Sequence, residues 1–190
     1  MSQYNQALTV GSVQDVAERN GATLAETIMN VTALILLDNS ESMKALDCPN
    51  YQERFSVAMR ELRRLQAAIE GKIGVVQFNC FPTFIAGGLP DSPYGSTDVA
   101  AALEYVQKID GCGIRIILIS DGEPDNEPLA LEVAKRFTDT RIETVYIGPE
   151  GGRGADFLRR LSALTGGVHV NQSVGEIPNL AATVTKLLSA

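Results

Sequence analysis

The chain has 190 residues, 45% of them hydrophobic and 21% charged, which is typical of one globular domain with a substantial apolar core. Its net charge of −7 argues against a nucleic-acid binder, since such a protein needs a basic surface for phosphates. No apolar run approaches the roughly 20 residues that span a bilayer, and residues 1–5 show no secretory signal. We therefore expect a cytoplasmic protein that contacts neither nucleic acid nor membrane.

The sequence pattern of residues 1–30 predicts a helical arm, separate from a domain over residues 31–190. Their apolar residues suggest two short helical pieces, and Thr23 and Glu26 have the spacing of a capping box. A helix-turn-helix is an alternative interpretation, but no third helix follows and Arg19 is the only basic residue of this stretch. We favour an arm that packs on the domain or on a partner over one that binds DNA.

From residue 32 onward, apolar runs alternate with amphipathic segments. The apolar runs predict strands over residues 32–37, 73–78, 83–85, 114–119, 143–147 and 168–170. Helical periodicity predicts helices over residues 51–70, 98–108, 129–137, 155–164 and 177–188. This alternation is typical of an α/β fold, a Rossmann-like, doubly wound parallel sheet with helices on both faces. Such sheets bind ligands outside the carboxyl ends of their strands.

Three segments with small oxygen-bearing side chains stand where such a ligand would bind. Asp38, Ser40 and Ser42 directly follow the first predicted strand. Thr97 belongs to a Gly-Ser-Thr-Asp sequence that opens a helix, and the third segment, Ser120-Asp121-Gly122, directly follows the fourth strand. The topology alone therefore places the first and third segments at one edge of the sheet.

These residue types suit a hard divalent cation. Mg²⁺ takes oxygen ligands in near-octahedral geometry, and the hydroxyls of Ser40, Ser42 and Thr97 are short neutral donors. The carboxylates of Asp38 and Asp121 can bind directly, or through water while they accept hydrogen bonds from the inner ligands. A cation held mostly by hydroxyls and water keeps much of its charge. It can then accept a carboxylate from another molecule, so we expect Mg²⁺, with Mn²⁺ or Ca²⁺ as alternatives.

The pattern Asp38-x-Ser40-x-Ser42, then Thr97, then Asp121 resembles the metal-ion-dependent adhesion site (MIDAS) of von Willebrand factor A (vWA) domains. The resemblance covers roughly residues 32 to 189 and matches five site positions in order. It implies a mostly parallel sheet of about six strands with one short antiparallel edge strand. It also implies that the serines, and often the threonine, contact the metal directly, while the two aspartates act mainly through water.

The same resemblance implies a protein-binding module whose partner supplies an Asp or Glu carboxylate. Intracellular members of the family often work beside AAA+ ATPases, chelatases or stress-response assemblies, and the resemblance alone implies such a setting for this chain. The oligomeric state stays open.

Each site residue also has a simpler structural interpretation. Asp38 could be a solvated loop cap, and Ser40 and Ser42 could be ordinary turn residues. Thr97 precedes an Asp-led helix and could be its N-cap, and Asp121 could belong to a plain turn at a strand end. All five coinciding by accident is much less plausible than any one of these alternatives.

Further acidic residues lie on or near the candidate loops. A hydrophilic surface explains each one singly, but together they would attract a cation and repel a strongly acidic partner. We therefore expect a partner that offers one carboxylate amid neutral or basic surface. These residues are Glu41, Asp47, Asp91, Asp98, Glu123, Asp125 and Glu127.

Two other functions remain open. A Mg²⁺-dependent phosphatase or phosphotransferase could use a similar sheet, but it generally needs a second acidic residue two positions after its nucleophilic Asp, where this chain has Ser40. No Lys in a matching motif follows, so we expect no enzyme activity. The domain could also be structural or regulatory, with a vestigial metal site.

The remaining motifs indicate little chemistry. The glycine-rich stretch 148–154 lacks the order of a phosphate or dinucleotide loop and is interpreted as a flexible connection. The arginines near residues 60–64 indicate the solvent face of a helix. Three cysteines without a CxxC pair and the single His169 leave almost no material for a zinc site or for Ser-His-Asp catalysis.

Overall fold

In this computed structural model the described residues are 8–189. The first seven residues of the expected arm and the last residue of the expected domain therefore lie outside them. No helix within the described range is long and apolar enough to cross a membrane.

The centre of the molecule is a six-stranded sheet with the order β3-β2-β1-β4-β5-β6. All neighbouring strands are parallel except β2 and β3, which pair antiparallel at one edge. The predicted α/β fold, mostly parallel with one short antiparallel edge strand, is confirmed. The strands are β1 (Ala33–Asp38), β2 (Ile73–Phe78), β3 (Thr83–Phe84), β4 (Arg115–Ser120), β5 (Ile142–Gly148) and β6 (His169–Ser173).

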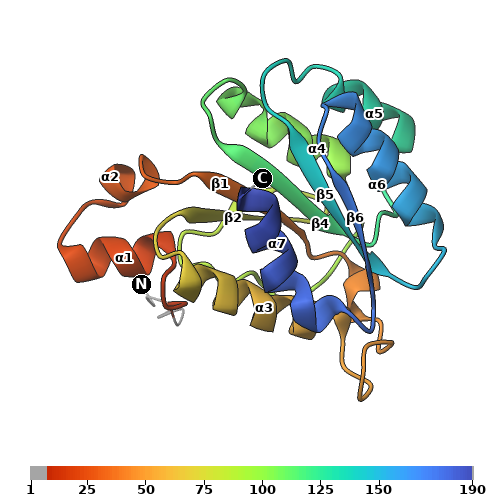
Figure 1. The fold of residues 1–190 in the computed structure, drawn as a ribbon, viewed down its shortest axis with the longest axis horizontal. Helices are drawn as coiled ribbons and strands as arrows, with labels where there is room; N and C mark the ends of the chain where they lie inside the picture. Colours follow the sequence, from red (N-terminus) through yellow and green to blue (C-terminus); the bar gives the residue numbers. More distant parts are fainter. Residues whose placement is uncertain (1–7, 190) are drawn as a thin grey trace.

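Helices cover both faces of this sheet (Figure 1). The α-helices are α1 (Val13–Asn20), α2 (Leu24–Ile28), α3 (Arg54–Ala68), α4 (Val99–Val106), α5 (Glu127–Ala134), α6 (Arg153–Leu164) and α7 (Leu180–Ser189). Three 3-10 helices join them, η1 (Glu41–Lys44), η2 (Gln107–Ile109) and η3 (Ile177–Asn179). Residues of α3 and α7 share one apolar core with the sheet, and residues of α4, α5 and α6 share the other.

The sequence of β1 shows why a strand between two helical layers is apolar throughout. Successive side chains of a strand point to opposite faces. Ile35 and Leu37 accordingly lie in the core beneath α3 and α7, while Leu36 lies in the core beneath α4, α5 and α6. A strand buried on both sides has no polar face, so the apolar run is continuous.

Most element boundaries differ from the sequence prediction by one to three residues, and two of the differences have a clear physical cause. Helix α3 begins at Arg54 and not at Tyr51, because Asn50 and Tyr51 have φ values of 62° and 54°, which a right-handed helix cannot contain. Strand β6 extends to Ser173, beyond the predicted range 168–170, because its last residues pair with β5 although their side chains are polar.

The N-terminal helices pack against the amino end of the sheet. The backbone N–H of Thr9 donates to the Gly87 carbonyl at 3.1 Å, and the N–H of Gly71 donates to the Gly11 carbonyl at 2.9 Å. The predicted capping box is confirmed: Thr23 and Glu26 each bond the other's backbone N–H at the start of α2. The two predicted helical pieces are present as α1 and α2, while the division into an arm over residues 1–30 and a domain over residues 31–190 stays a prediction.

Candidate metal centre

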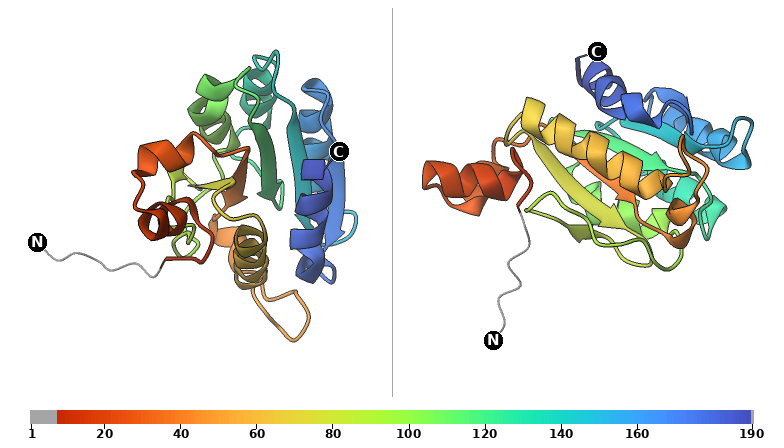
Figure 2. Two further views of the ribbon diagram at one scale, coloured as in Figure 1. Left: turned by 60° about the vertical axis from the view of Figure 1, so that its left-hand side comes forward. Right: turned by 90° about the horizontal axis from the view of Figure 1, so that it is seen from below.

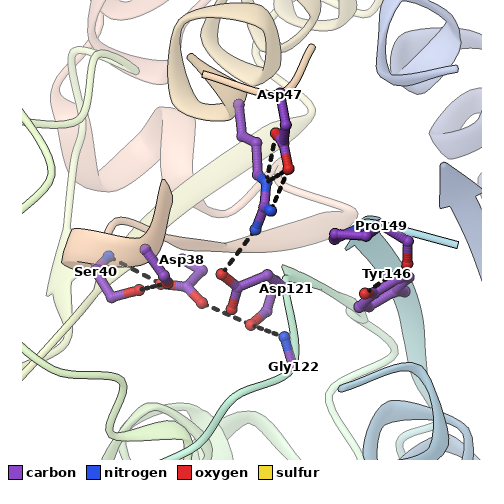
Figure 3. A network of polar contacts seen from close by, with 10 residues as sticks. Asp38, Ser40, Asp47, Asp121, Gly122, Tyr146 and Pro149 are labelled. Atoms are coloured by element: carbon purple, nitrogen blue, oxygen red, sulfur yellow. Dashed lines mark hydrogen bonds and ion pairs between the residues drawn. The ribbon is translucent and has the colours of Figure 1, made fainter. Parts of the chain in front are cut away.

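The candidate site lies where the strand order changes direction. β1 pairs with β2 on one side and with β4 on the other, and all three are parallel. Asp38 is the last residue of β1, and Asp121 directly follows β4. The two carboxyl groups lie next to one another in Figure 3. The sheet therefore brings two predicted site residues together from positions far apart in the sequence.

Asp38 is fully buried, with 0% of its surface exposed. One carboxylate oxygen accepts a hydrogen bond from the Ser40 N–H at 2.9 Å, and the other accepts from the Ser120 hydroxyl at 2.6 Å. These bonds favour the ionised form, but burial and the nearby charge of Asp121 outweigh them and raise the pKa of Asp38 to about 7. The interpretation of Asp38 as a solvated loop cap is wrong.

Ser40 and Ser42 place their hydroxyl oxygens together. The two Oγ atoms lie 3.0 Å apart, and Ser40 is buried where the chain enters η1. The side chain of Ser40 makes no capping bond to that 3-10 helix. The Ser40 hydroxyl is therefore not engaged as a helix cap and can serve as an oxygen ligand.

Asp121 is 3% exposed and has one satisfied and one unsatisfied oxygen. Its Oδ2 accepts a hydrogen bond from the Arg54 guanidinium at 3.2 Å. Its Oδ1 is buried and has no hydrogen-bond partner. A buried carboxylate oxygen without a donor is costly, and a cation is one group that would remove this cost.

The backbone around Asp121 is held tightly against helix α6. Gly122 has a φ of 72°, and a Cβ there would lie 2.4 Å from the Gly154 carbonyl oxygen. A Cβ on Gly154 would lie 2.0 Å from the Asp121 carbonyl oxygen. The close approach of the two segments requires glycine in both, so the stretch 148–154 is more than a flexible connection.

Thr97 lies beside this cluster, on the loop that opens α4. The Thr97 N–H donates to the Asp125 carboxylate at 3.1 Å, and the Asp125 N–H donates back to the Thr97 carbonyl at 3.0 Å. The N-cap of α4 is Asp98, whose side chain accepts from the Ala101 N–H. The alternative role of Thr97 as the N-cap is therefore wrong, and the capping bond does not engage its hydroxyl.

Backbone hydrogen bonds join the Thr97 loop to the Asp38 loop. The Tyr94 N–H donates to the Asn39 carbonyl at 2.9 Å, and the Glu41 N–H donates to the Gly95 carbonyl at 3.0 Å. The Asn79 side chain, after β2, donates to the Asn39 side chain at 2.9 Å. All three predicted loops are thus neighbours at one end of the sheet.

These residues fit a divalent cation that prefers oxygen. The site supplies two buried carboxylates, a pair of serine hydroxyls, and one carboxylate oxygen without a partner. No cluster of three or more His, Cys, Asp or Glu side chains that could hold a metal occurs within residues 8–189. A metal here would therefore depend on hydroxyl oxygens and water as well as on Asp38 and Asp121, which suits Mg²⁺ or Mn²⁺ better than zinc.

Two residues that contact the aspartates were not among the predicted site residues, although Ser120 belongs to the third candidate segment. Ser120 donates to Asp38 and also accepts from the Gly122 N–H at 2.9 Å. Arg54 donates to Asp121 and, through Nε, to Asp47 at 2.9 Å, and its guanidinium also pairs with Asp47 through Nη2. A separation of 67 residues between Arg54 and Asp121 leaves no local signal for this pair.

Most of the acidic residues near the site have a partner within the chain. Asp47 pairs with Arg54, Asp98 caps α4, and the Asp91 carboxylate accepts from the Gln77 amide at 2.9 Å. Glu127 pairs with Arg160 on the neighbouring helix. Glu41 pairs with Lys44, and Asp125 accepts from the Thr97 N–H. Four carboxylates close to the metal loops are exposed, those of Glu41, Asp91, Glu123 and Asp125, and we call these four the acidic rim.

No protein-family model matches the sequence, and no curated protein matches it significantly. Solved structures do match. The manganese-loaded TRAP protein of Plasmodium vivax is 17% identical, with a TM-score of 0.53, over 85% of this chain and 74% of that one. A von Willebrand factor type A protein from Catenulispora acidiphila is 15% identical, with a TM-score of 0.59, over 84% of this chain and 42% of that one.

The fold is that of a vWA domain. A third match is proximal thread matrix protein 1 from the mussel byssus, 17% identical with a TM-score of 0.59. It covers 83% of this chain and 47% of its own. The chain thus spans less than half of two of these structures and about three quarters of the other.

Proposed function

We propose that this vWA-like domain is a metal-dependent protein-interaction module. A divalent cation, Mg²⁺ or in its place Mn²⁺ or Ca²⁺, is held by the hydroxyls of Ser40, Ser42 and Thr97 and by Asp38 and Asp121, as in the MIDAS resemblance. A partner protein then supplies an Asp or Glu carboxylate to the cation.

The observation that carries the proposal is the unpartnered Asp121 oxygen beside the buried Asp38. Two neighbouring buried carboxylates repel each other. Within residues 8–189, Arg54 is the one cationic side chain that pairs with either of them. A doubly charged cation would neutralise the pair. The manganese in the TRAP structure is consistent with this interpretation but belongs to that protein.

Binding is favoured over catalysis by the position of Asp38. As a nucleophile in a phosphatase it would have to reach the substrate, yet it is fully buried and bonded to Ser40 and Ser120. The residue two positions on is Ser40 and not a second acid. Turnover of a generic phosphate ester that disappears in Asp38→Asn would favour the enzyme instead.

The acidic rim sharpens the expected partner. Four exposed carboxylates around the loops favour a partner surface that is neutral or basic around its single coordinating carboxylate. An intracellular assembly with an AAA+ ATPase or a stress-response complex remains a proposal that rests on the MIDAS resemblance alone.

Thermal unfolding with Mg²⁺ and with EDTA tests the metal site. A ligand that binds only the folded state raises the melting temperature. We expect a rise with Mg²⁺ that is absent from the Ser40→Ala, Ser42→Ala double variant. Unchanged melting of the parent protein would favour the vestigial site.

Affinity capture then tests the partner step. The wild-type domain and the double variant serve as matched baits, with elution by EDTA. A protein that binds only the wild type, releases with EDTA, and loses binding when one of its acidic residues is neutralised would support the proposal. A partner that binds both baits equally would contradict it.

A further inference from the structure

A loop next to the metal centre projects from the body of the molecule. Residues 45–53, here called the projecting segment, lie between η1 and α3 and appear in orange at the lower edge of Figure 1. They lie at the opposite end of the molecule from helices α1 and α2 (Figure 2). Backbone bonds close the segment at its base, from the Arg54 N–H to the Ala45 carbonyl at 3.1 Å, and across its middle, from the Cys48 N–H to the Gln52 carbonyl at 3.3 Å.

The projecting segment has a strained turn and two exposed apolar side chains. Asn50 and Tyr51 both have positive φ values, 62° and 54°, which is unusual for a bulky residue such as tyrosine. The Tyr51 side chain is 87% exposed, and Leu46 is exposed as well. Strain of this kind persists where the surrounding structure holds it, and it clusters at binding and switch regions.

One buried arginine links this segment to the candidate metal centre. Arg54 donates to both oxygens of Asp47, which belongs to the projecting segment, at 2.9 and 3.1 Å through Nε. Its Nη1 donates to Asp121 at 3.2 Å. Figure 3 shows Asp121 beside Asp38, with Asp47 further out. The guanidinium thus neutralises the same carboxylate that a metal would use.

We propose that Arg54 is a positioning residue that couples metal binding to the projecting segment, an inference that rests on the proposed metal site. Arg54 and a divalent cation compete for the charge of Asp121 and repel each other. When the cation binds, Arg54 loses part of its attraction to Asp121 and depends more on Asp47. The Arg54 guanidinium and Asp47 are already in hydrogen-bond contact, so the pair would move away from Asp121 as a unit, and the projecting segment would shift with it.

The coupling is reciprocal by thermodynamic necessity. If the metal shifts the projecting segment, then a partner that clamps Tyr51 and Leu46 changes the metal affinity by the same factor. The strength of partner contacts at the projecting segment would thus depend on whether the metal is bound. Because Arg54 repels the cation, its removal should strengthen metal binding, whereas a purely structural support of Asp121 would give the opposite result.

A tryptophan reporter measures the shift directly. The chain contains no tryptophan, so Tyr51→Trp places a single indole at the tip of the segment. We expect Mg²⁺ to change its fluorescence emission over the same concentration range that gives heat in calorimetry. The matched control, Tyr105→Trp on α4, carries an exposed indole away from the segment and should not respond.

Substitution of Arg54 separates charge from geometry. In the Tyr51→Trp background we expect Arg54→Gln to bind Mg²⁺ roughly fivefold more tightly or better, the lower end of typical coupling between sites, and to lose the emission change. Arg54→Lys keeps the charge but not the planar fork, so it should keep near wild-type affinity and lose most of the response. Arg63→Gln removes the same charge from the exposed face of α3 and should change neither quantity.

Asp47→Asn supplies a second route in case Arg54→Gln fails to fold, which circular dichroism would show. Without the Asp47 charge, Arg54 is held by Asp121 alone, so we expect weaker Mg²⁺ binding and no emission change. Metal binding without any emission change at Tyr51→Trp would overturn the coupling and leave the metal site intact. Weaker binding in a folded Arg54→Gln would also overturn it. Absence of Mg²⁺ heat in the parent protein would overturn the metal site and the coupling together.

Discussion

Aspartates at opposite ends of the sheet differ in how well hydrogen bonds satisfy their carboxylates. At the amino end, Asp110 accepts backbone N–H bonds from Thr138, Asp139 and Thr140, at 2.8, 3.2 and 2.7 Å. These donors hold the pKa of Asp110 well below its usual range. At the carboxyl end, Asp121 keeps one buried oxygen without a partner, and the pKa of Asp38 is raised to about 7.

The difference separates a structural carboxylate from one that fits a ligand. The Asp110 carboxylate joins its own loop to the 138–140 loop, and backbone donors of the chain satisfy it without a ligand. Asp38 and Asp121 have fewer donors than two buried charges need, which is destabilising unless another cation is present. Removing a carboxylate should therefore lower the stability at the amino end and raise it at the carboxyl end.

The largest change in stability should come from removing the Asp110 carboxylate, which backbone donors satisfy. Asp110→Ala leaves the N–H groups of the 138–140 loop without their acceptor, so we expect the free energy of unfolding to fall by about 2–3 kcal/mol. Urea denaturation measures this loss. The rise in melting temperature with Mg²⁺ should remain, and its disappearance would contradict the separation of the two ends.

Neutralising Asp38 should have a smaller effect and the opposite sign. Without metal at pH 7.5, Asp38→Asn removes a buried charge, so we expect the free energy of unfolding to rise by about 1 kcal/mol. The stabilisation by Mg²⁺ should vanish in the same protein. A loss of more than about 2 kcal/mol in urea would instead make Asp38 a structural residue like Asp110.

The same carboxylate predicts an unusual dependence on pH. The pKa of Asp38 is raised from 3.8 to about 7 in the folded protein, so between these values the native state holds a proton that the unfolded chain releases. Its contribution to stability is therefore present below pH 4 and is lost as the pH rises to 7. The lowered pKa of Asp110 acts oppositely, with stability lost as the pH falls through the acid range.

Urea denaturation of wild type and Asp38→Asn, without metal, measures the Asp38 contribution. The wild type should lose stability relative to Asp38→Asn between pH 5 and 7.5, by on the order of a few kcal/mol at most. Mg²⁺ stabilisation of the wild type should increase over the same range, because the metal needs the ionised carboxylate. A difference that is constant with pH would contradict the raised pKa.

The smallest effect should come from the acidic rim. Neutralising Glu41 and Glu123 to Gln leaves the buried contacts in place, so we expect less than about 0.5 kcal/mol of change in stability. Mg²⁺ affinity should fall about twofold at low salt and less at high salt, because exposed charges are screened. An equal loss at both salt concentrations would mean that one of these residues contacts the metal.

Most of the sheet could be predicted because its strands are buried on both faces. The apolar run of β2 has the same bounds in prediction and structure, Ile73–Phe78. The edge strand β6 was predicted too short because its residues after Val170 are polar. Only their pairing with β5 identifies them as part of a strand. The start of α3 was placed too early because Asn50 and Tyr51 adopt positive φ, which their residue types do not predict.

Part of the site could be predicted because its residues directly follow strands that the sequence identifies. Asp38, Ser40 and Ser42 lie close in sequence, and strand topology brings Asp121 to them. The roles of Arg54 and Ser120 depend on side-chain contacts across 67 and 82 residues, for which a single sequence holds no signal. The partners of the acidic residues near the site also depend on such contacts.

Calorimetric titration of Mg²⁺ into the wild-type domain and Asp121→Asn at pH 7.5 tests the central claim most directly. The wild type should bind one ion per chain, and Asp121→Asn should bind at least roughly tenfold more weakly, as expected when a carboxylate of a metal site is neutralised. Equal binding by the two proteins, or no heat from the wild type, would contradict a metal centre at this end of the sheet.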